Sequence, residues 1–216
     1  MHGWSALILA GGAGRRFGGG KLLASLAGQP VIRRVVEKVV AGRFAEVLVV
    51  TGADDNAIGS ALRGLACRVI HAPDWAEGMA ATLRSGVSAI SPDSDGVCIF
   101  LGDMPLVPVD LCGTLIAAAN GAGYAARPCA AGKPGHPVAF SRAAFSDLLT
   151  LTGDQGAAAL LKQHPGKVAY CETDSGGVLF DIDTPGDLAT AERAWNACAT
   201  SATSESATSR GDLPKP

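Results

Sequence analysis

The sequence predicts an α/β fold in which a mostly parallel sheet lies between layers of helices. Short β-rich apolar runs alternate with longer helical patterns, and this alternation is typical of strands joined by right-handed helical crossovers. The run Val97–Leu101 is continuously apolar, as strands buried in a parallel sheet are. The chain has 216 residues, of which 48% are hydrophobic, so it can bury one sizeable core.

The first half of the chain is expected to provide three strands and two helices. Pro30 suits the first turn of a helix because its φ is fixed, and Asp54 or Asp55 can cap the next helix. In order, the expected elements are a strand at Ala6–Ala10, a Gly-rich loop to Lys21, a helix from Pro30 to about Val40, a strand at Glu46–Thr51, a helix through Leu65 and a strand at Cys67–His71.

The second half continues the alternation, beginning with a helix after Gly78. The expected elements are a helix near Thr82–Ala89, a strand at Val97–Leu101, a helix over Pro108–Asn120, strands at Tyr124–Arg127 and Pro137–Phe140, and helices over 154–163 and 185–198. From Ala199 the sequence is rich in Thr, Ser and Ala and offers almost nothing to bury. We therefore predict one domain over residues 1–198 and a disordered tail over 199–216.

Charge and composition exclude several classes of function. The net charge is −2, and no basic stripe or polybasic cluster indicates a nucleic-acid or membrane partner. No apolar run reaches the roughly 18 residues of a membrane span, and the N-terminus lacks the features of a signal peptide. The six cysteines form no C-x-x-C motif, which favours reduced, mostly buried thiols. We expect a cytoplasmic protein with no nucleic-acid or membrane partner.

The Gly-rich segment LAGGAGRRFGGGK, residues 9–21, is the first candidate site. It fails as a dinucleotide fingerprint, because Phe17 stands where the third Gly belongs, and it also fails as a Walker A loop. Successive Gly residues still allow backbone N–H groups to converge on an anion. Arg16 can hold phosphate oxygens with its planar fork, and Lys21 adds a point charge. The alternative is an ordinary strand-to-helix loop whose cations face water.

Two acidic motifs follow later in the chain. Asp103, in LGDMPLV, comes directly after the strand expected at 97–101, at the strand end where α/β sheets bind ligands. Asp181 and Asp183 lie in DIDTPGDL, and in extended backbone both side chains point the same way. Thr184 is the natural N-cap of the following helix. Such carboxylates can hold Mg²⁺ together with phosphate oxygens and water.

The pattern LAGGxxxRxGxxK resembles the signature of the MobA-like nucleotidyltransferases, which transfer an NMP from an NTP. The resemblance implies their three-layer, Rossmann-like fold of the nucleotide-diphospho-sugar transferase type. It also implies that Arg16, Lys21 and Asp103 are catalytic, and that Asp103 and Asp183 hold Mg²⁺ with Asp181 in support. The nucleotide-binding residues that it implies are Leu9, Ala10, Gly11, Gly12, Gly14, Arg16, Lys21, Gly78 and Thr82.

Later motifs resemble the branch that contains the molybdenum cofactor cytidylyltransferases. PDWAEGMAATLRSG, residues 73–86, is similar to PDWAEGLGSSLRAG of that branch and is expected near the nucleobase, with Thr82 as the remaining polar contact. GKPGHPVAF and TGDQGAAALLKQH imply an acceptor side that includes His136 and Asp154. The residues themselves also allow a turn role for this histidine and a helix-cap role for this aspartate.

The motifs lead us to expect transfer of CMP, in preference to GMP, to the terminal phosphate of molybdopterin, with release of pyrophosphate. Gly11 instead favours GMP, because cytidylyltransferases more often have Ala at this position and guanylyl-transferring relatives have Gly. The alternatives are a different phosphorylated acceptor, or a non-catalytic cofactor-binding accessory protein of a molybdenum hydroxylase. A few relatives on this scaffold are redox enzymes, which leaves a redox role open. Expected partners are CTP or GTP, the acceptor, and a molybdenum hydroxylase or its chaperone.

Overall fold

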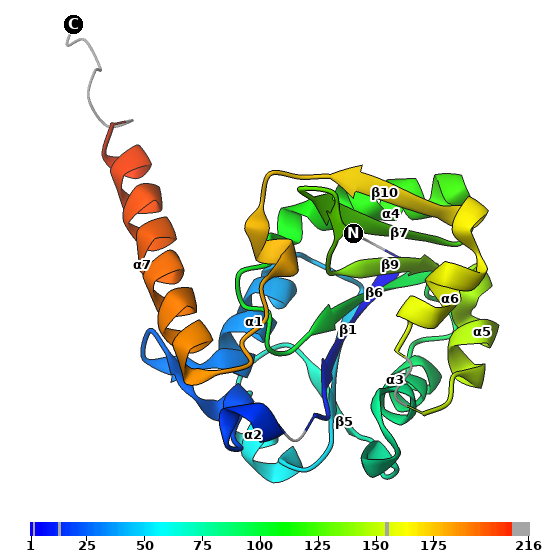
Figure 1. Cartoon of the computed structure of the whole chain (residues 1–216), viewed down its shortest axis with the longest axis horizontal. Coiled ribbons are helices and arrows are strands. Elements are labelled where there is room, and N and C mark those ends of the chain that lie inside the picture. The colour runs from blue at the N-terminus through cyan, green and yellow to red at the C-terminus, as the bar shows by residue number, and fades with distance from the viewer. Residues whose placement is uncertain (2, 13, 154–155, 209–216) are drawn as a thin grey trace, which may run out of the picture.

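A mixed sheet runs through the centre of the molecule, with helices on both sides (Figure 1). The computed structural model describes residue 1 and residues 3–12, 14–153 and 156–208. Within these residues, eight strands form the sheet, in the order β10-β7-β9-β6-β1-β4-β5 with β8 paired to β7. The strands are β1 (Trp4–Ala10), β4 (Glu46–Thr51), β5 (Arg68–His71), β6 (Gly96–Leu101), β7 (Ala125–Ala130), β8 (Lys133–Pro134), β9 (Val138–Ser141) and β10 (Val168–Glu172), and a separate hairpin joins β2 (Ser25–Leu26) to β3 (Gln29–Pro30).

Most neighbouring strands are parallel, which confirms the predicted fold class. β1 pairs in parallel with β4 and β6, β4 with β5, and β7 with β10. β9 is antiparallel to both β6 and β7. The connection from β7 to β9 contains only β8 and short turns, and a return this short cannot make the crossover that a parallel neighbour requires.

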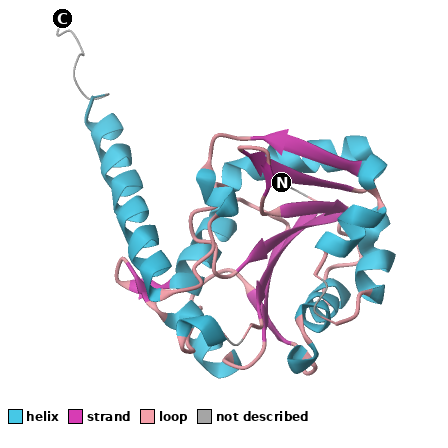
Figure 2. Ribbon diagram, viewed as in Figure 1, coloured by secondary structure: helices cyan, strands magenta, loops and turns pink. Residues whose placement is uncertain are grey.

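Helices cover both faces of the sheet (Figure 2). From β1, Ala6 and Ile8 join a core with α1, α2 and α4, whereas Leu7 joins a core with α3, α5 and α6. Both faces of β1 are therefore buried, which explains its nearly continuous apolar sequence. The helices are α1 (Val31–Ala41), α2 (Asp55–Ala61), α3 (Met79–Ser88), α4 (Cys112–Ala122), α5 (Phe145–Thr150), α6 (Ala158–Gln163) and α7 (Pro185–Thr208).

A third, smaller core ties the C-terminal helix to the hairpin. Leu26, Ile182 and Ala191 are buried together, and the guanidinium of Arg34 lies 5.2 Å from the ring centroid of Trp195 in α7. The first turns of α7 are thus anchored against α1 and the hairpin. The rest of α7 projects away from the sheet (Figure 1).

The edge strand β10 and the short helix α5 have no counterpart among the predicted elements. In β10, Val168 is buried but Tyr170 is 55% exposed, so the strand lacks the continuous apolar run of β6. Strands at a sheet edge bury less surface, and their local pattern is correspondingly weak. The helix predicted over Pro108–Asn120 begins as a 3-10 turn, and α4 itself starts at Cys112.

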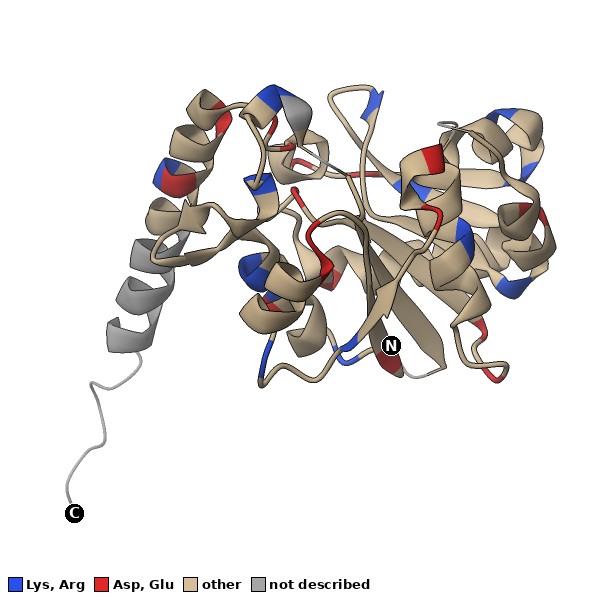
Figure 3. Cartoon of the chain, turned by 90° about the horizontal axis from the view of Figure 1, so that it is seen from below, with Lys and Arg blue, Asp and Glu red and all other residues tan. Residues whose placement is uncertain are grey.

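The C-terminal end differs from its prediction. α7 continues to Thr208, so residues 199–208 of the predicted disordered tail are helical, and residues 209–216 lie outside the described residues. Across the described ranges, no helix combines the length and apolarity needed to cross a membrane. In the view of Figure 3, acidic and basic residues are interspersed and do not form one basic stripe. The described cysteines are free thiols, as predicted: Cys67, Cys98, Cys112, Cys129 and Cys171.

Candidate active site

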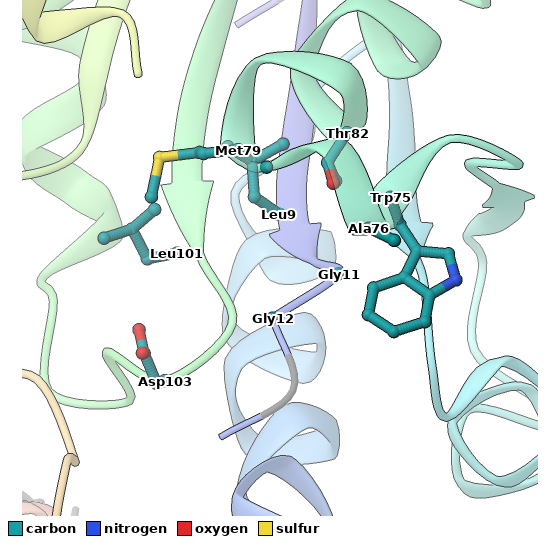
Figure 4. Close-up of a pocket in the computed structure, with 10 residues that line it drawn as sticks. Leu9, Gly11, Gly12, Trp75, Ala76, Met79, Thr82, Leu101 and Asp103 are labelled. Atoms are coloured by element: carbon teal, nitrogen blue, oxygen red, sulfur yellow. The ribbon is translucent and has the colours of Figure 1, made fainter. Parts of the chain in front are cut away.

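A cleft of about 580 Å³ opens at the carboxyl ends of β1 and β6 (Figure 4). Ligands bind at such positions in α/β sheets because the loops after neighbouring parallel strands meet there. β1 and its loop contribute Leu9, Gly11 and Gly12, and the segment after β6 contributes Leu101 and Asp103. We call the remaining side the α3 wall, and it consists of Trp75, Ala76, Gly78, Met79 and Thr82.

Four predicted site residues meet beside the cleft, and we call Arg16, Lys21, Asp103 and Asp183 the charged cluster. Nζ of Lys21 donates to Oδ2 of Asp103 at 2.7 Å and to Oδ1 of Asp183 at 3.1 Å. Nη1 of Arg16 lies 2.8 Å from Oδ2 of Asp183. Lys21 and Asp183 are 162 positions apart in the chain, so only the fold brings them together.

Lys21 is held as a cation between two carboxylates. Burial by itself lowers the pKa of Lys21, but the hydrogen bonds and charges of Asp103 and Asp183 outweigh it and raise the pKa above its ordinary value. Gly14, at φ +58, lets the loop fold back tightly over Lys21, because a Cβ at this position would lie 3.2 Å from the Lys21 Cβ. The loop therefore places an ammonium group, favoured in its charged form, at the edge of the cleft.

Asp183 is positioned by both of its chain neighbours. The N–H of Ile182 donates to the carbonyl of Asp103 at 3.0 Å, and the Ile182 side chain is buried. Thr184 and Asp187 then cap α7 reciprocally, since the backbone N–H of each residue donates to the side chain of the other. The predicted capping role of Thr184 is confirmed. Hydrogen bonds from Thr184 lower the pKa of Asp187, so the cap keeps its negative charge.

The two carboxylates of the cluster suit a divalent cation that arrives with ligands of its own. Oδ1 of Asp103 is buried and has no hydrogen-bond partner, although a buried unpaired acceptor normally costs stability. Mg²⁺ commonly takes one or two carboxylates and completes an octahedron with phosphate oxygens and water. No group of three or more His, Cys, Asp or Glu side chains in the described ranges could hold a metal alone. Asp103 and Asp183 therefore fit a cation that is bound jointly with a triphosphate.

The α3 wall presents few polar side chains to the cleft. Thr82 is buried, and the neighbouring positions are Ala80 and Ala81, also buried. Gly11 packs directly on Thr82: a Cβ at Gly11 would lie 2.6 Å from Oγ1 and 2.9 Å from Cγ2 of Thr82. Only glycine fits between β1 and α3 while Thr82 stays in place. Gly78 is the residue from which α3 begins.

His136 does not belong to the described residues that line the cleft. Its N–H donates to the carbonyl of Val178 at 2.8 Å, and its Nδ1 is buried without a partner. Burial, followed by the charge of Arg127, lowers the pKa of His136 to about 4, while a hydrogen bond to the Ile99 backbone and the charge of Asp181 oppose this shift. His136 is therefore a neutral imidazole at pH 7. Asp181 is exposed and acts on His136 electrostatically.

Asp154, the second residue expected on the acceptor side, lies outside the described residues. The described residues on either side of it contact the start of α3. The N–H of Ala80 donates to the carbonyl of Gly153 at 3.1 Å, and a Cβ at Gly156 would lie 2.7 Å from Sδ of Met79. Residues 153 and 156 therefore approach the first turn of α3.

Four cleft residues are missing from the predicted set, and one predicted side chain points elsewhere. The missing residues are Trp75, Ala76, Met79 and Leu101. Each lies within three positions of a predicted contact, and this proximity was the available signal. The Ala10 side chain is buried in the core shared with α1. Only the backbone of Ala10 can therefore reach a nucleotide.

Residues 6–168 match the family model of the MobA-like NTP transferase domain. The chain is 31% identical to the purine catabolism protein PucB of Bacillus subtilis, over 88% of this chain and 96% of PucB. It is 27% identical to nicotine blue oxidoreductase of Paenarthrobacter nicotinovorans, over 83% and 92% of the two chains. It is 24% identical to molybdenum cofactor cytidylyltransferase of Escherichia coli, over 90% and 98%.

Two solved structures share the fold. A nucleotidyl transferase from Methanothermobacter has a TM-score of 0.79 at 23% identity, over 90% of this chain and 98% of that one. The Mycobacterium tuberculosis H37Rv protein Rv0371c, in a complex with manganese, has a TM-score of 0.75 at 24% identity, over 88% and 98%. These likenesses establish the architecture alone. The family model covers most of the sequence, and on this ground the chain belongs to the MobA-like NTP transferase family.

Proposed function

We propose that the protein is a divalent-metal-dependent nucleotidyltransferase that transfers an NMP, with CMP favoured over GMP, to the terminal phosphate of molybdopterin and releases pyrophosphate. The charged cluster beside the open cleft is the observation that carries this proposal. Two cations suited to a triphosphate lie next to two carboxylates suited to Mg²⁺. The cluster therefore complements both parts of a metal–NTP complex.

In the proposed reaction, an oxygen of the acceptor phosphate attacks the α-phosphorus, and the bond from that phosphorus to the bridging oxygen of pyrophosphate breaks. The attacking oxygen already carries negative charge, so the protein need not remove a proton. Its contribution is positioning and charge stabilisation. Lys21 and Arg16 neutralise phosphate oxygens, and Asp103 and Asp183 would hold Mg²⁺, whose chemistry is to offset charge on the phosphates.

The packing of Gly11 weakens the argument for GTP. Cytidylyltransferases more often have Ala at this position, and their motif has Ser where this chain has Thr82. Here the Oγ1 and Cγ2 atoms of Thr82 occupy space that an alanine Cβ at Gly11 would need. Glycine directly after β1 therefore leaves room for the Thr82 side chain on α3. Gly11 has a packing role that is independent of the base, while the motif at residues 73–86 supports cytosine.

The acceptor is proposed from three motifs that resemble molybdenum cofactor cytidylyltransferases, at residues 73–86, 132–140 and 152–164. The names of two other relatives, a purine catabolism protein and an oxidoreductase, keep a different acceptor and a redox role as alternatives. The complete charged cluster argues against a non-catalytic accessory protein, because binding alone needs no pair of metal ligands. A cytoplasmic location and a molybdenum hydroxylase or chaperone as partner stay predictions.

The experiment that tests the proposal incubates purified protein with CTP or GTP, Mg²⁺ and molybdopterin, and measures pyrophosphate. We expect release to be faster with CTP and to stop when the metal is chelated. No release with either nucleotide contradicts transfer to molybdopterin, and a screen of phosphorylated acceptors with labelled NTP then tests the alternative. A thermal-shift comparison of CTP, GTP, ATP and UTP measures base preference directly, because ligand binding stabilises the folded state.

A further inference from the structure

Three of the four carboxylate oxygens at the expected metal site already contact a cation of the protein itself. Nζ of Lys21 lies between Oδ2 of Asp103 and Oδ1 of Asp183, at 2.7 and 3.1 Å. Nη1 of Arg16 lies 2.8 Å from the other oxygen of Asp183. Only Oδ1 of Asp103 has no partner. A metal ion held by both carboxylates would therefore need oxygens that Lys21 and Arg16 now contact.

The two protein cations differ in how firmly they are held. The Arg16 side chain is 80% exposed, and an exposed ion pair contributes little to stability. The Lys21 side chain is 13% exposed and contacts both carboxylates, so solvent screens its ion pairs much less. Lys21 is therefore the stronger competitor for a metal ion at this site.

A pair of nearby carboxylates is stable in the folded protein only when a positive charge offsets their repulsion and their partial burial. Lys21 supplies that charge in the free protein. A triphosphate offers Lys21 equivalent partners, because phosphate oxygens bind an ammonium group as carboxylates do. Gly18, Gly19 and Gly20 precede Lys21, and a Cβ built on any of them would meet no atom within 4 Å outside the adjacent residues. These three positions therefore do not pack tightly against another part of the described chain.

We propose that Lys21 is an internal substitute for the metal ion, which closes the Asp103–Asp183 site in the free protein and opens it when a bound triphosphate takes over its ammonium group. The inference rests on the proposed function for the identity of the nucleotide. Its consequence is that nucleotide and divalent cation bind cooperatively, because each raises the affinity of the protein for the other by the same factor. Free metal ions are then bound weakly while the cleft is empty.

The first test measures Mn²⁺ binding by electron paramagnetic resonance, without nucleotide, to the wild-type chain and three variants. We expect Lys21→Gln to bind Mn²⁺ about tenfold more tightly than wild type, a usual size for one coupled interaction. Lys21→Arg keeps the charge and should bind as weakly as wild type. Lys162→Gln, which removes an exposed lysine from α6, is the matched control and should also resemble wild type. Equal affinities of wild type and a folded Lys21→Gln overturn the proposal.

A second test uses the wild-type chain, so it can support or overturn the proposal even when Lys21→Gln does not fold. It follows the ¹H–¹⁵N NMR signal of the Lys21 ammonium group. Mg²⁺ alone should leave this signal in place, whereas CTP or GTP with Mg²⁺ should shift it, and a shift caused by Mg²⁺ alone contradicts the proposal. Failure of the proposed function has a different signature, since no nucleotide then raises the melting temperature and no pyrophosphate forms.

Discussion

The two ends of the cleft use different chemistry. At one end, the charged cluster consists of four side chains that are joined by salt bridges. At the other end, the α3 wall offers apolar or small side chains and one buried hydroxyl, that of Thr82. Figure 4 shows Asp103 and Trp75 on opposite sides of the cleft, with Gly11 and Gly12 between them.

This difference separates the proposed chemistry from the choice of nucleotide. A triphosphate with its metal is the same in all four NTPs, so the charged cluster cannot distinguish one base from another. The α3 wall must select a base through shape, backbone groups and the Thr82 hydroxyl. Changes in the cluster should therefore reduce turnover with every NTP, whereas changes in the wall should alter the preference among NTPs.

The largest effect is expected from Asp103→Asn, which removes a charge from the metal site. Turnover should fall by at least about a hundredfold with each NTP, because charge stabilisation is the main contribution of such a site. Pyrophosphate release measures this loss, and circular dichroism with thermal melting checks that the fold survives. Retained activity would exclude Asp103 from the reaction.

Lys21→Ala should weaken NTP binding by roughly tenfold to a hundredfold, because the variant loses a charge-assisted contact with phosphate. Isothermal titration calorimetry with CTP and GTP measures the change. Both nucleotides should lose the same factor if the charged cluster ignores the base. A loss confined to one nucleotide would contradict the assignment of triphosphate binding to the charged cluster and of base selection to the α3 wall.

Gly11→Ala tests the packing of β1 against α3. The added Cβ would lie 2.6 Å from Oγ1 of Thr82, and overpacking of this kind costs about 1–3 kcal/mol of unfolding free energy. Thr82→Ala removes both Oγ1 and Cγ2, the two atoms nearest to the added Cβ, so the double variant should recover most of that stability. Urea unfolding of the two single variants and the double variant completes a double-mutant cycle. Additive effects would show that Gly11 and Thr82 do not compensate each other.

The smallest effect on the proposed activity is expected at His136, away from both ends of the cleft, where the change concerns the pH dependence of stability. The pKa of His136 is lowered from 6.5 to about 4, so the unfolded chain takes up this proton at higher pH than the folded chain does. The stabilisation is fully present above pH 6.5 and is lost as the pH falls from 6.5 through 4, with a total of about 3 kcal/mol. His136→Gln should lose less stability than wild type between pH 7 and pH 4.5 in urea unfolding. Parallel curves for the two proteins would contradict the low pKa.

The central strands could be predicted from the sequence because their burial leaves a local signature. The strand expected at Glu46–Thr51 is β4 with the same ends, and the apolar run Val97–Leu101 is β6 with one further residue. The apolar pattern does not predict a strand that is only partly buried, as at Tyr170 in β10. It also does not predict the end of α7, because this helix continues into a segment with almost no apolar residues.

The sequence by itself determined the order of the main strands and helices, the Gly-rich loop suited to phosphate at residues 9–21, and the identities of the candidate charged residues. These are local properties, since a glycine-rich turn or a carboxylate after an apolar strand is visible within a few positions. Only the tertiary structure decided that Lys21 bridges both carboxylates and that Gly11 makes room for Thr82. Such contacts depend on the strand order of the sheet and on how closely its helices pack, and no local pattern encodes either of them.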